Sequence, residues 1–322
     1  MSSGPGATKH GGSIPVLDGV LPGVDHVDVD VFVPARPSRV IAVAVPGGGM
    51  ARTYFDLDLD GYSMARHLAA QGITVVTVDL PGVGTSPRPD DPSGLHPDML
   101  AELLAAISAR VVERAADGAL VEGLAPMPSV RSVGLGHSMG AMLTVMAQGR
   151  RPVFDRLVLL GWSGRGLPEA LSPDEAAFAG RADDLRREIG VLARARFGQD
   201  LPAAPRRPAS SDRLIVSPID REVRAALGRA SAPMLTQAGL WAMIPGSHDR
   251  EREAIGGPVL CGVGEYDITG EPGELPGWLP NAEVDVVVTE GAGHNTNVAP
   301  GRVALWDAVG AWCRTDRPGT AR

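Results

Sequence analysis

The feature that most constrains this chain is a serine held between two glycines, directly after a short apolar run. Residues 130–135 alternate between apolar and small side chains, and Gly-His-Ser-Met-Gly follows at positions 136–140 before a helix-compatible run. This order predicts a strand, a sharp turn and a helix, with the Ser138 hydroxyl raised above the edge of a sheet. The chain holds 41 glycines, so the motif has low specificity alone and its context must support it.

Strand-like and helix-like segments alternate along most of the chain. A continuous apolar run, typical of a strand buried on both faces, occupies residues 40–45, and further strand-like runs occupy residues 73–80, 156–161, 258–263 and 284–288. Helical patterns occupy residues 61–71, 97–115 and 302–313. Residues 24–33 alternate valine with polar residues and predict an antiparallel strand near an edge. The predicted fold class is α/β, with a mainly parallel sheet flanked by helices.

The alternation breaks between residues 163 and 247, which carry helical stretches joined by segments rich in Pro, Gly and Arg. We therefore predict a helical cap, or lid, over residues 163–247. The α/β core then comprises residues 14–162 and 248–322. Residues 1–13 are rich in Gly and Ser, and we expect them to form a disordered tail.

A serine nucleophile needs a base to take its proton and an acid to orient that base. Asp267 follows the predicted strand at 258–263, and His294 follows the strand at 284–288. The carboxyl ends of parallel strands share one edge of a sheet, so we expect both side chains near Ser138. Glu265 is a local alternative for the acid, but Asp267 is preferred because its loop has left the strand before the carboxylate appears.

Attack by Ser138 on a carbonyl creates an oxyanion that needs hydrogen-bond donors. The Met139 N–H stands at the start of the helix after Ser138, where the helix dipole also favours negative charge. A second donor is expected from the loop Pro-Gly-Gly-Gly-Met at positions 46–50. Gly48, Gly49 and Met50 are its candidates, and Gly49 or Met50 is preferred.

Together these motifs resemble the α/β-hydrolase superfamily. The resemblance rests on residues 46–49, 79–86 (Asp-Leu-Pro-Gly-Val-Gly-Thr-Ser), 136–140, 264–267 and 291–294. It implies a capped member with a Ser138–His294–Asp267 triad. The superfamily's oxyanion loop usually begins His-Gly, whereas this chain has Pro46. Dehalogenases and epoxide hydrolases of the superfamily use an aspartate nucleophile, and Ser138 argues against both.

The first functional hypothesis is a serine hydrolase that cleaves an ester or thioester of a small, largely apolar substrate, free or carrier-bound. The second is a biosynthetic enzyme with the same triad, acting as an acyltransferase, cyclase, thioesterase or eliminase. The third is a ligand-binding protein with little turnover. We expect four large side chains to contact the substrate. Trp162 follows a strand end, Trp241 and Met243 lie in the lid, and His137 precedes the nucleophile.

Composition argues against several other classes. Lys9 is the only lysine, so no Walker loop or Schiff-base lysine is available. The net charge of −8 and the lack of a basic stripe argue against nucleic acid. Cys261 and Cys313 lie in apolar runs and are expected to be buried thiols. No histidine shows metal-ligand spacing, so neither metal nor cofactor is expected. No apolar run is long enough to span a bilayer, and the first twelve residues lack a signal-peptide core, which predicts a cytoplasmic protein.

Overall fold

The computed structural model describes residues 7–16, 21–201, 214–216 and 218–315. Within these residues, one sheet has the strand order β1-β2-β4-β3-β5-β6-β7-β8. The bounds are β1 Thr8–Pro15, β2 His26–Val33, β3 Val40–Val45, β4 Thr74–Val78, β5 Arg131–His137, β6 Arg156–Leu160, β7 Gly257–Gly264 and β8 Ala282–Thr289. β2 runs antiparallel to both β1 and β4, and the pairs from β4 to β8 are parallel. The predicted fold class is confirmed.

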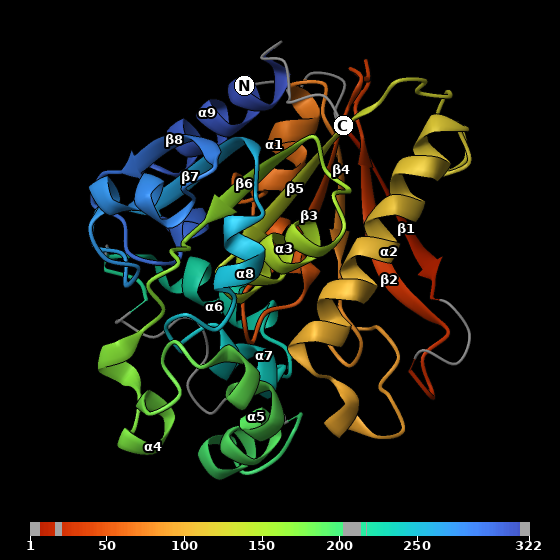
Figure 1. The fold of residues 1–322 in the computed structure, drawn as a ribbon. Coiled ribbons are helices and arrows are strands. Elements are labelled where there is room, and N and C mark those ends of the chain that lie inside the picture. Colours follow the sequence, from red (N-terminus) through yellow and green to blue (C-terminus); the bar gives the residue numbers. More distant parts are fainter. Residues whose placement is uncertain (1–6, 17–20, 202–213, 217, 316–322) are drawn as a thin grey trace.

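Helices cover both faces of the sheet (Figure 1). α2 (Pro97–Ala116) and α3 (Met139–Arg150) pack in one apolar core, with α8 (Asp249–Glu253) against α3. α1 (Met64–Ala70) and α9 (Arg302–Arg314) pack in a second core on the other face. Short 3-10 helices are also present: η1 Arg52–Phe55, η2 Pro92–Gly94, η3 Pro168–Ala170, η4 Pro272–Trp278 and η5 Thr296–Val298.

The prediction of a disordered tail is wrong for residues 8–13. They belong to β1, which pairs with β2 from Thr8 opposite Val33 to Pro15 opposite His26. Backbone hydrogen bonds do not depend on side-chain type, so a Gly- and Ser-rich stretch can complete a sheet when a partner strand is available. Lys9 also lies 3.0 Å from Asp30 and 3.0 Å from Asp56, which fixes the strand by charge. Residues 1–6 of the expected tail lie outside the described residues.

The described residues between β6 and α8 form four α-helices, grouped at the bottom of Figure 1. These are α4 (Pro173–Ala176), α5 (Ala182–Phe197), α6 (Arg221–Arg229) and α7 (Thr236–Trp241). Apolar side chains of α5 and α7 join the core built on α2 and α3, and those of α6 join the core of α1 and α9. The lid is thus packed against both halves of the core.

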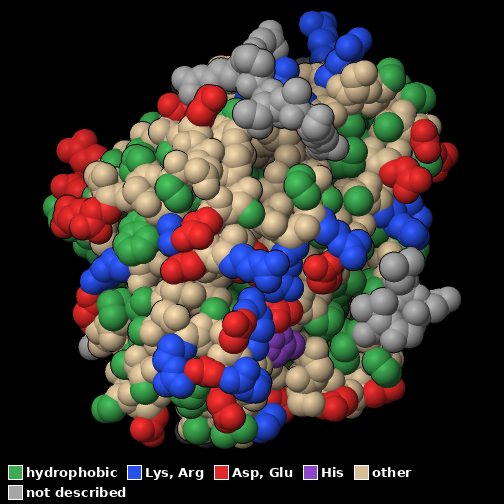
Figure 2. All heavy atoms as spheres, viewed as in Figure 1, with side chains coloured by type: hydrophobic (Ala, Val, Ile, Leu, Met, Phe, Trp, Pro, Cys, Tyr) green, Lys and Arg blue, Asp and Glu red, His purple; other side chains and the backbone are tan. Residues whose placement is uncertain are grey.

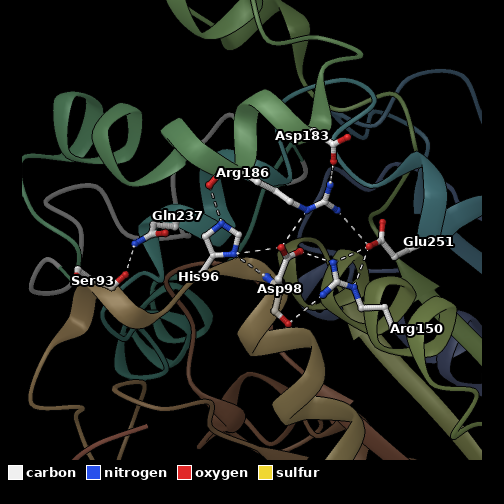
Figure 3. A network of polar contacts seen from close by, with 8 residues as sticks. All are labelled: Ser93, His96, Asp98, Arg150, Asp183, Arg186, Gln237 and Glu251. Carbon is white, nitrogen blue, oxygen red and sulfur yellow. Dashed lines mark hydrogen bonds and ion pairs between the residues drawn. The ribbon is translucent and has the colours of Figure 1, made fainter. Parts of the chain in front are cut away.

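A polar network ties the lid to the core (Figure 3). Arg186 of α5 places Nε 3.0 Å from Oδ2 of Asp98, at the start of α2, and lies 3.5 Å from Glu251 of α8. Arg150, at the end of α3, lies 2.7 Å from Glu251 and also pairs with Asp98. Two guanidinium groups therefore share the carboxylates of Asp98 and Glu251 across four helices, and Arg186 also lies 2.7 Å from the exposed Asp183.

Charge on the face drawn in Figure 2 is mixed, with acidic and basic side chains interleaved over its lower half. Such interleaving gives a weak net field, because opposite charges within a few ångströms cancel at longer range. Among the described side chains visible on this face, none form a basic stripe of the kind that binds a phosphate backbone.

We expect Glu251→Gln to destabilise the fold by about 1–3 kcal/mol, because the two guanidinium groups then share Asp98, and the further partner of Arg186, Asp183, is 89% exposed. The Glu251 side chain is only 4% exposed, whereas both arginines are partly solvated and limit the loss. Urea denaturation of both proteins measures the difference. Glu102→Gln is the control: its partner Arg151 is 65% exposed, so a loss below about 1 kcal/mol is expected. Equal losses would contradict a special role for the network.

Candidate active site

Ser138 occupies a strained turn between β5 and α3, with φ 53° and ψ −121°. A positive φ is rare for a residue with a side chain and is tolerated where surrounding structure enforces it. Both flanking glycines are required here. A Cβ at Gly136 would collide with the backbone of Ala141, and one at Gly140 would collide with the carbonyl groups of Val45 and Pro46. The predicted tight turn is present.

Asp267 and His294 lie on the loops that follow β7 and β8, and their side chains meet. His294 Nδ1 is 2.8 Å from Asp267 Oδ1. A carboxylate only accepts, so Nδ1 carries the proton and Nε2 is left as a proton acceptor. The Gly264 N–H donates to the other carboxylate oxygen at 3.3 Å. The structure thus brings together the acid and the base expected from sequence.

The Asp267 carboxylate is fully buried and held in its charged form. Burial alone would raise its pKa, but the charge of His294, the hydrogen bond from His294 and the N–H of Gly264 outweigh burial and keep the pKa below its usual value. The rival acid, Glu265, instead accepts from the Gly291 N–H at 2.8 Å and is exposed. Glu265 therefore stabilises the loop after β8 and does not contact the histidine.

Ser138 and His294 face a common cavity of about 200 Å³. Most of its wall is apolar or glycine. The lining residues are Gly47, Gly48, Met50, His137, Ser138, Met139, Gly161, Trp162, Ser163, Gly166, Leu167, Leu214, Met234, Gly239, Ala242, Met243, Ile268, Thr269, His294 and Asn295. Eight of these twenty residues lie between 163 and 247, so the segment predicted to be a lid forms part of the cavity wall.

Three of the four side chains expected to contact substrate line this cavity: Trp162, Met243 and His137. The fourth expectation, Trp241, is wrong. Its side chain is fully buried, its ring lies 5.9 Å from that of His96, and the guanidinium of Arg186 lies 5.5 Å from it. A six-residue helix presents several apolar side chains, and only its packing decides which of them face the cavity.

The glycine loop (residues 46–51) lies beside Ser138, as predicted. Gly48, Met50 and Met139 line the cavity, whereas Gly49 does not. The Met50 N–H donates to the Gly47 carbonyl at 3.2 Å and is occupied in that turn. Of the loop candidates that line the cavity, Gly48 is the one whose N–H is not used in this turn, so we now expect Gly48 to be the donor, together with Met139, whose N–H starts α3.

Tyr54 is a buried neighbour of the site that sequence reasoning missed. Its hydroxyl lies 3.3 Å from Nε2 of His137, and Nε2 is also 3.1 Å from the backbone oxygen of His294. Because that oxygen only accepts, His137 donates to it and steadies the loop that carries His294. Burial, with the charge of His294, lowers the pKa of His137 to about 3, so His137 is neutral near neutral pH. No motif marks Tyr54 in the sequence.

A mainly parallel sheet, a serine at a strained strand-to-helix turn and an Asp–His pair after later strands together define the α/β-hydrolase class. The chain belongs to the Alpha/beta hydrolase family, which matches residues 42–304. This assignment agrees with the resemblance found in the motifs. A comparison with curated proteins finds no match.

Solved structures share the fold at low identity. A carboxyl esterase from Bacillus coagulans, solved with glycerol, has a TM-score of 0.63 at 18% identity, covering 94% of this chain and 97% of its own. An esterase from Thermogutta terrifontis, solved with malate, has a TM-score of 0.57 at 18% identity, with 95% and 98% covered. The thioesterase domain of the curacin biosynthetic pathway has a TM-score of 0.59 at 17% identity, with 95% and 99% covered.

The sequence expectations on metals, thiols and membrane spans concern the residues that the structure describes. These residues contain no cluster of three His, Cys, Asp or Glu side chains that could hold a metal ion. Cys261 and Cys313 are free and buried, and burial raises the pKa of each thiol to about 12. Across the same part of the chain, every helix is too short or too polar to cross a membrane.

Two buried histidines make stability depend on pH. Burial lowers the pKa of His248 to about 4, and that of His137 is about 3, against about 6.5 in an unfolded chain. Between these values the unfolded state binds more protons, so stability falls as the pH drops from 6.5 towards 4.

We expect His248→Gln to reduce this slope by up to about 1.4 kcal/mol per pH unit, because one proton is no longer taken up on unfolding. Urea denaturation at a series of pH values from 7 to 4.5 measures both slopes. Parallel curves for the two proteins would show that His248 is protonated to the same extent in the folded and unfolded states.

Proposed function

We propose that this protein is a serine hydrolase that cleaves an ester or thioester through an acyl-enzyme on Ser138. The observation that carries the proposal is the arrangement around one cavity: a strained serine and a histidine held by a buried carboxylate share its wall. The Ser138 side chain stands at the N-terminus of α3 but makes no capping hydrogen bond to it. This turn presents the Ser138 hydroxyl as a nucleophile would be presented.

The mechanism follows from the roles of these groups. Ser138 Oγ attacks the carbonyl carbon while Nε2 of His294 takes the hydroxyl proton, and Asp267 stabilises the resulting imidazolium. The N–H groups of Met139 and Gly48 bind the oxyanion. The tetrahedral intermediate collapses, and the alcohol or thiol leaves with the proton from His294. Water then attacks the acyl-enzyme, His294 removes its proton, and the acid departs as Ser138 is regenerated.

The cavity wall supports a small, uncharged acyl group as the substrate. Among the described lining residues, none is Asp, Glu, Lys or Arg. A charged group would therefore lose its hydration without gaining a partner. Four methionines line the cavity: Met50, Met139, Met234 and Met243. Their flexible side chains adapt to acyl groups of different shape. The esterase and thioesterase neighbours are consistent with this chemistry.

We expect Ser138→Ala to abolish labelling by a fluorophosphonate probe and to lower kcat for a p-nitrophenyl ester by about 10³-fold or more. Ser163→Ala is the matched control, because Ser163 also lines the cavity but lies outside the strained turn. It should be labelled like the wild type. Labelling and turnover that survive in Ser138→Ala would rule out the covalent mechanism.

The acceptor of the acyl group is tested by its product. Reaction in water enriched in oxygen-18 should place one heavy oxygen in the released acid, because water attacks the acyl-enzyme. A product without that oxygen would instead favour acyl transfer, cyclisation or elimination on the same triad.

Substrate charge gives a further prediction. The esters p-nitrophenyl butyrate and p-nitrophenyl hemisuccinate are similar in size but differ in charge. We expect kcat/KM to be about 100-fold lower for the hemisuccinate, because the cavity wall offers no cation to pair with its carboxylate. Initial rates over a range of substrate concentrations measure this ratio. Comparable values would mean that the acyl group lies outside the apolar cavity.

A further inference from the structure

The lid pairs with the glycine loop through its backbone. The Ala51 N–H donates to the Ala230 carbonyl at 2.8 Å, and the Ala232 N–H donates to the Gly49 carbonyl at 2.9 Å. Met50 and Ser231 thus form an antiparallel bridge outside the main sheet. Ala230 and Ala232 are buried, so water does not compete for these hydrogen bonds. Residues 230–232 are named the lid strap below.

The core holds the far end of the same loop. Asp79, fully buried at the end of β4, accepts from the Arg52 N–H at 2.6 Å and pairs with the Arg52 guanidinium. A Cβ at Gly84 would collide with this carboxylate, which explains why the 79–86 motif has glycine there. Beyond Met50, the core therefore positions the loop through Arg52.

The donor itself lies between these two supports. Residues 47–49 are glycines without side chains to pack, and the turn from Met50 N–H to Gly47 O is their only internal backbone bond in the described structure. Gly48 meets the lid again, because a Cβ there would lie 3.6 Å from Met234. Glycine-rich backbone is costly to order, so its geometry depends on the groups bound to it.

We propose that the lid strap positions the oxyanion donor, so that the oxyanion hole is complete only while the strap is paired with the glycine loop. The inference rests on the proposed hydrolase function and concerns the regulation of that same site. The strap touches no reacting atom; it acts through Gly49 and Met50 on the Gly48 N–H. A substrate that fits the lid badly then loses rate in the chemical step as well as affinity.

The two hydrogen bonds between the lid strap and the glycine loop can be removed by substituting proline for the donor residue, because proline has no backbone N–H. Ala232→Pro deletes the bond to Gly49, and Ala51→Pro deletes the bond to Ala230. Ala51 has φ −87°, close to the angle that proline requires. We expect both variants to lower kcat and kcat/KM together by about 10–100-fold, with KM within about twofold of the wild type, because the lost interaction acts in the transition state.

Arg221→Pro is the matched control. Arg221 is exposed at the first position of α6, in the lid, where the N–H has no intrahelical acceptor and proline is favoured. It should retain wild-type kcat and KM. Circular dichroism of each variant checks folding, and Ala51→Pro replaces Ala232→Pro if the latter does not fold.

Hydrogen exchange provides a readout that does not depend on activity. The peptide of residues 46–52 has the same amino-acid sequence in Ala232→Pro and in the wild type, so its exchange can be compared directly. We expect the Ala51 amide to exchange faster in the variant, while the amides of β5 keep their protection. Faster exchange with a fall in kcat supports the inference. Unchanged exchange, unchanged kcat, or a rise in KM alone overturns it. A wild-type protein that neither hydrolyses esters nor reacts with fluorophosphonate would instead overturn the proposed function.

Discussion

The site depends on the close approach of the turn at Ser138 to the end of β3. Gly140 packs directly on the carbonyl groups of Val45 and Pro46, where any Cβ would collide. This contact sets the start of α3 beside the glycine loop, so Met139 and Gly48 reach the same cavity. Parallel pairing of β3 with β5 holds the two strand ends level. This backbone contact therefore brings Ser138 and the glycine loop to one cavity.

Two buried carboxylates support this arrangement in different ways. Asp267 stays charged because His294 and the Gly264 N–H stabilise it, and it orients the base. For Asp79, burial outweighs the stabilisation by Arg52 and raises the pKa, and the group holds the backbone that follows the glycine loop. Neither carboxylate lines the cavity. Burying charge is costly, so each is retained with several hydrogen bonds that fix the position of a neighbouring group.

The lid contributes more than a cover. Apolar packing of α5 and α7 on one core and of α6 on the other places it over the cavity, and the network of Arg186, Asp98 and Glu251 fixes one side. The lid strap reaches the glycine loop on another side. Under the role proposed for the lid strap, substrate shape and oxyanion stabilisation are linked through one inserted segment, so that a change in the lid changes the rate.

The sequence by itself determined the α/β class and the order of the strands along the chain, because these depend on local periodicity. It also predicted that Asp267 meets His294, because parallel strands end at one edge of a sheet. Tertiary structure alone decided which chain segments meet. It turned residues 8–13 into an edge strand, buried Trp241 away from the cavity, and closed the Met50 N–H into a turn with the Gly47 carbonyl. Each outcome depends on a partner distant in sequence, and no local pattern encodes that partner.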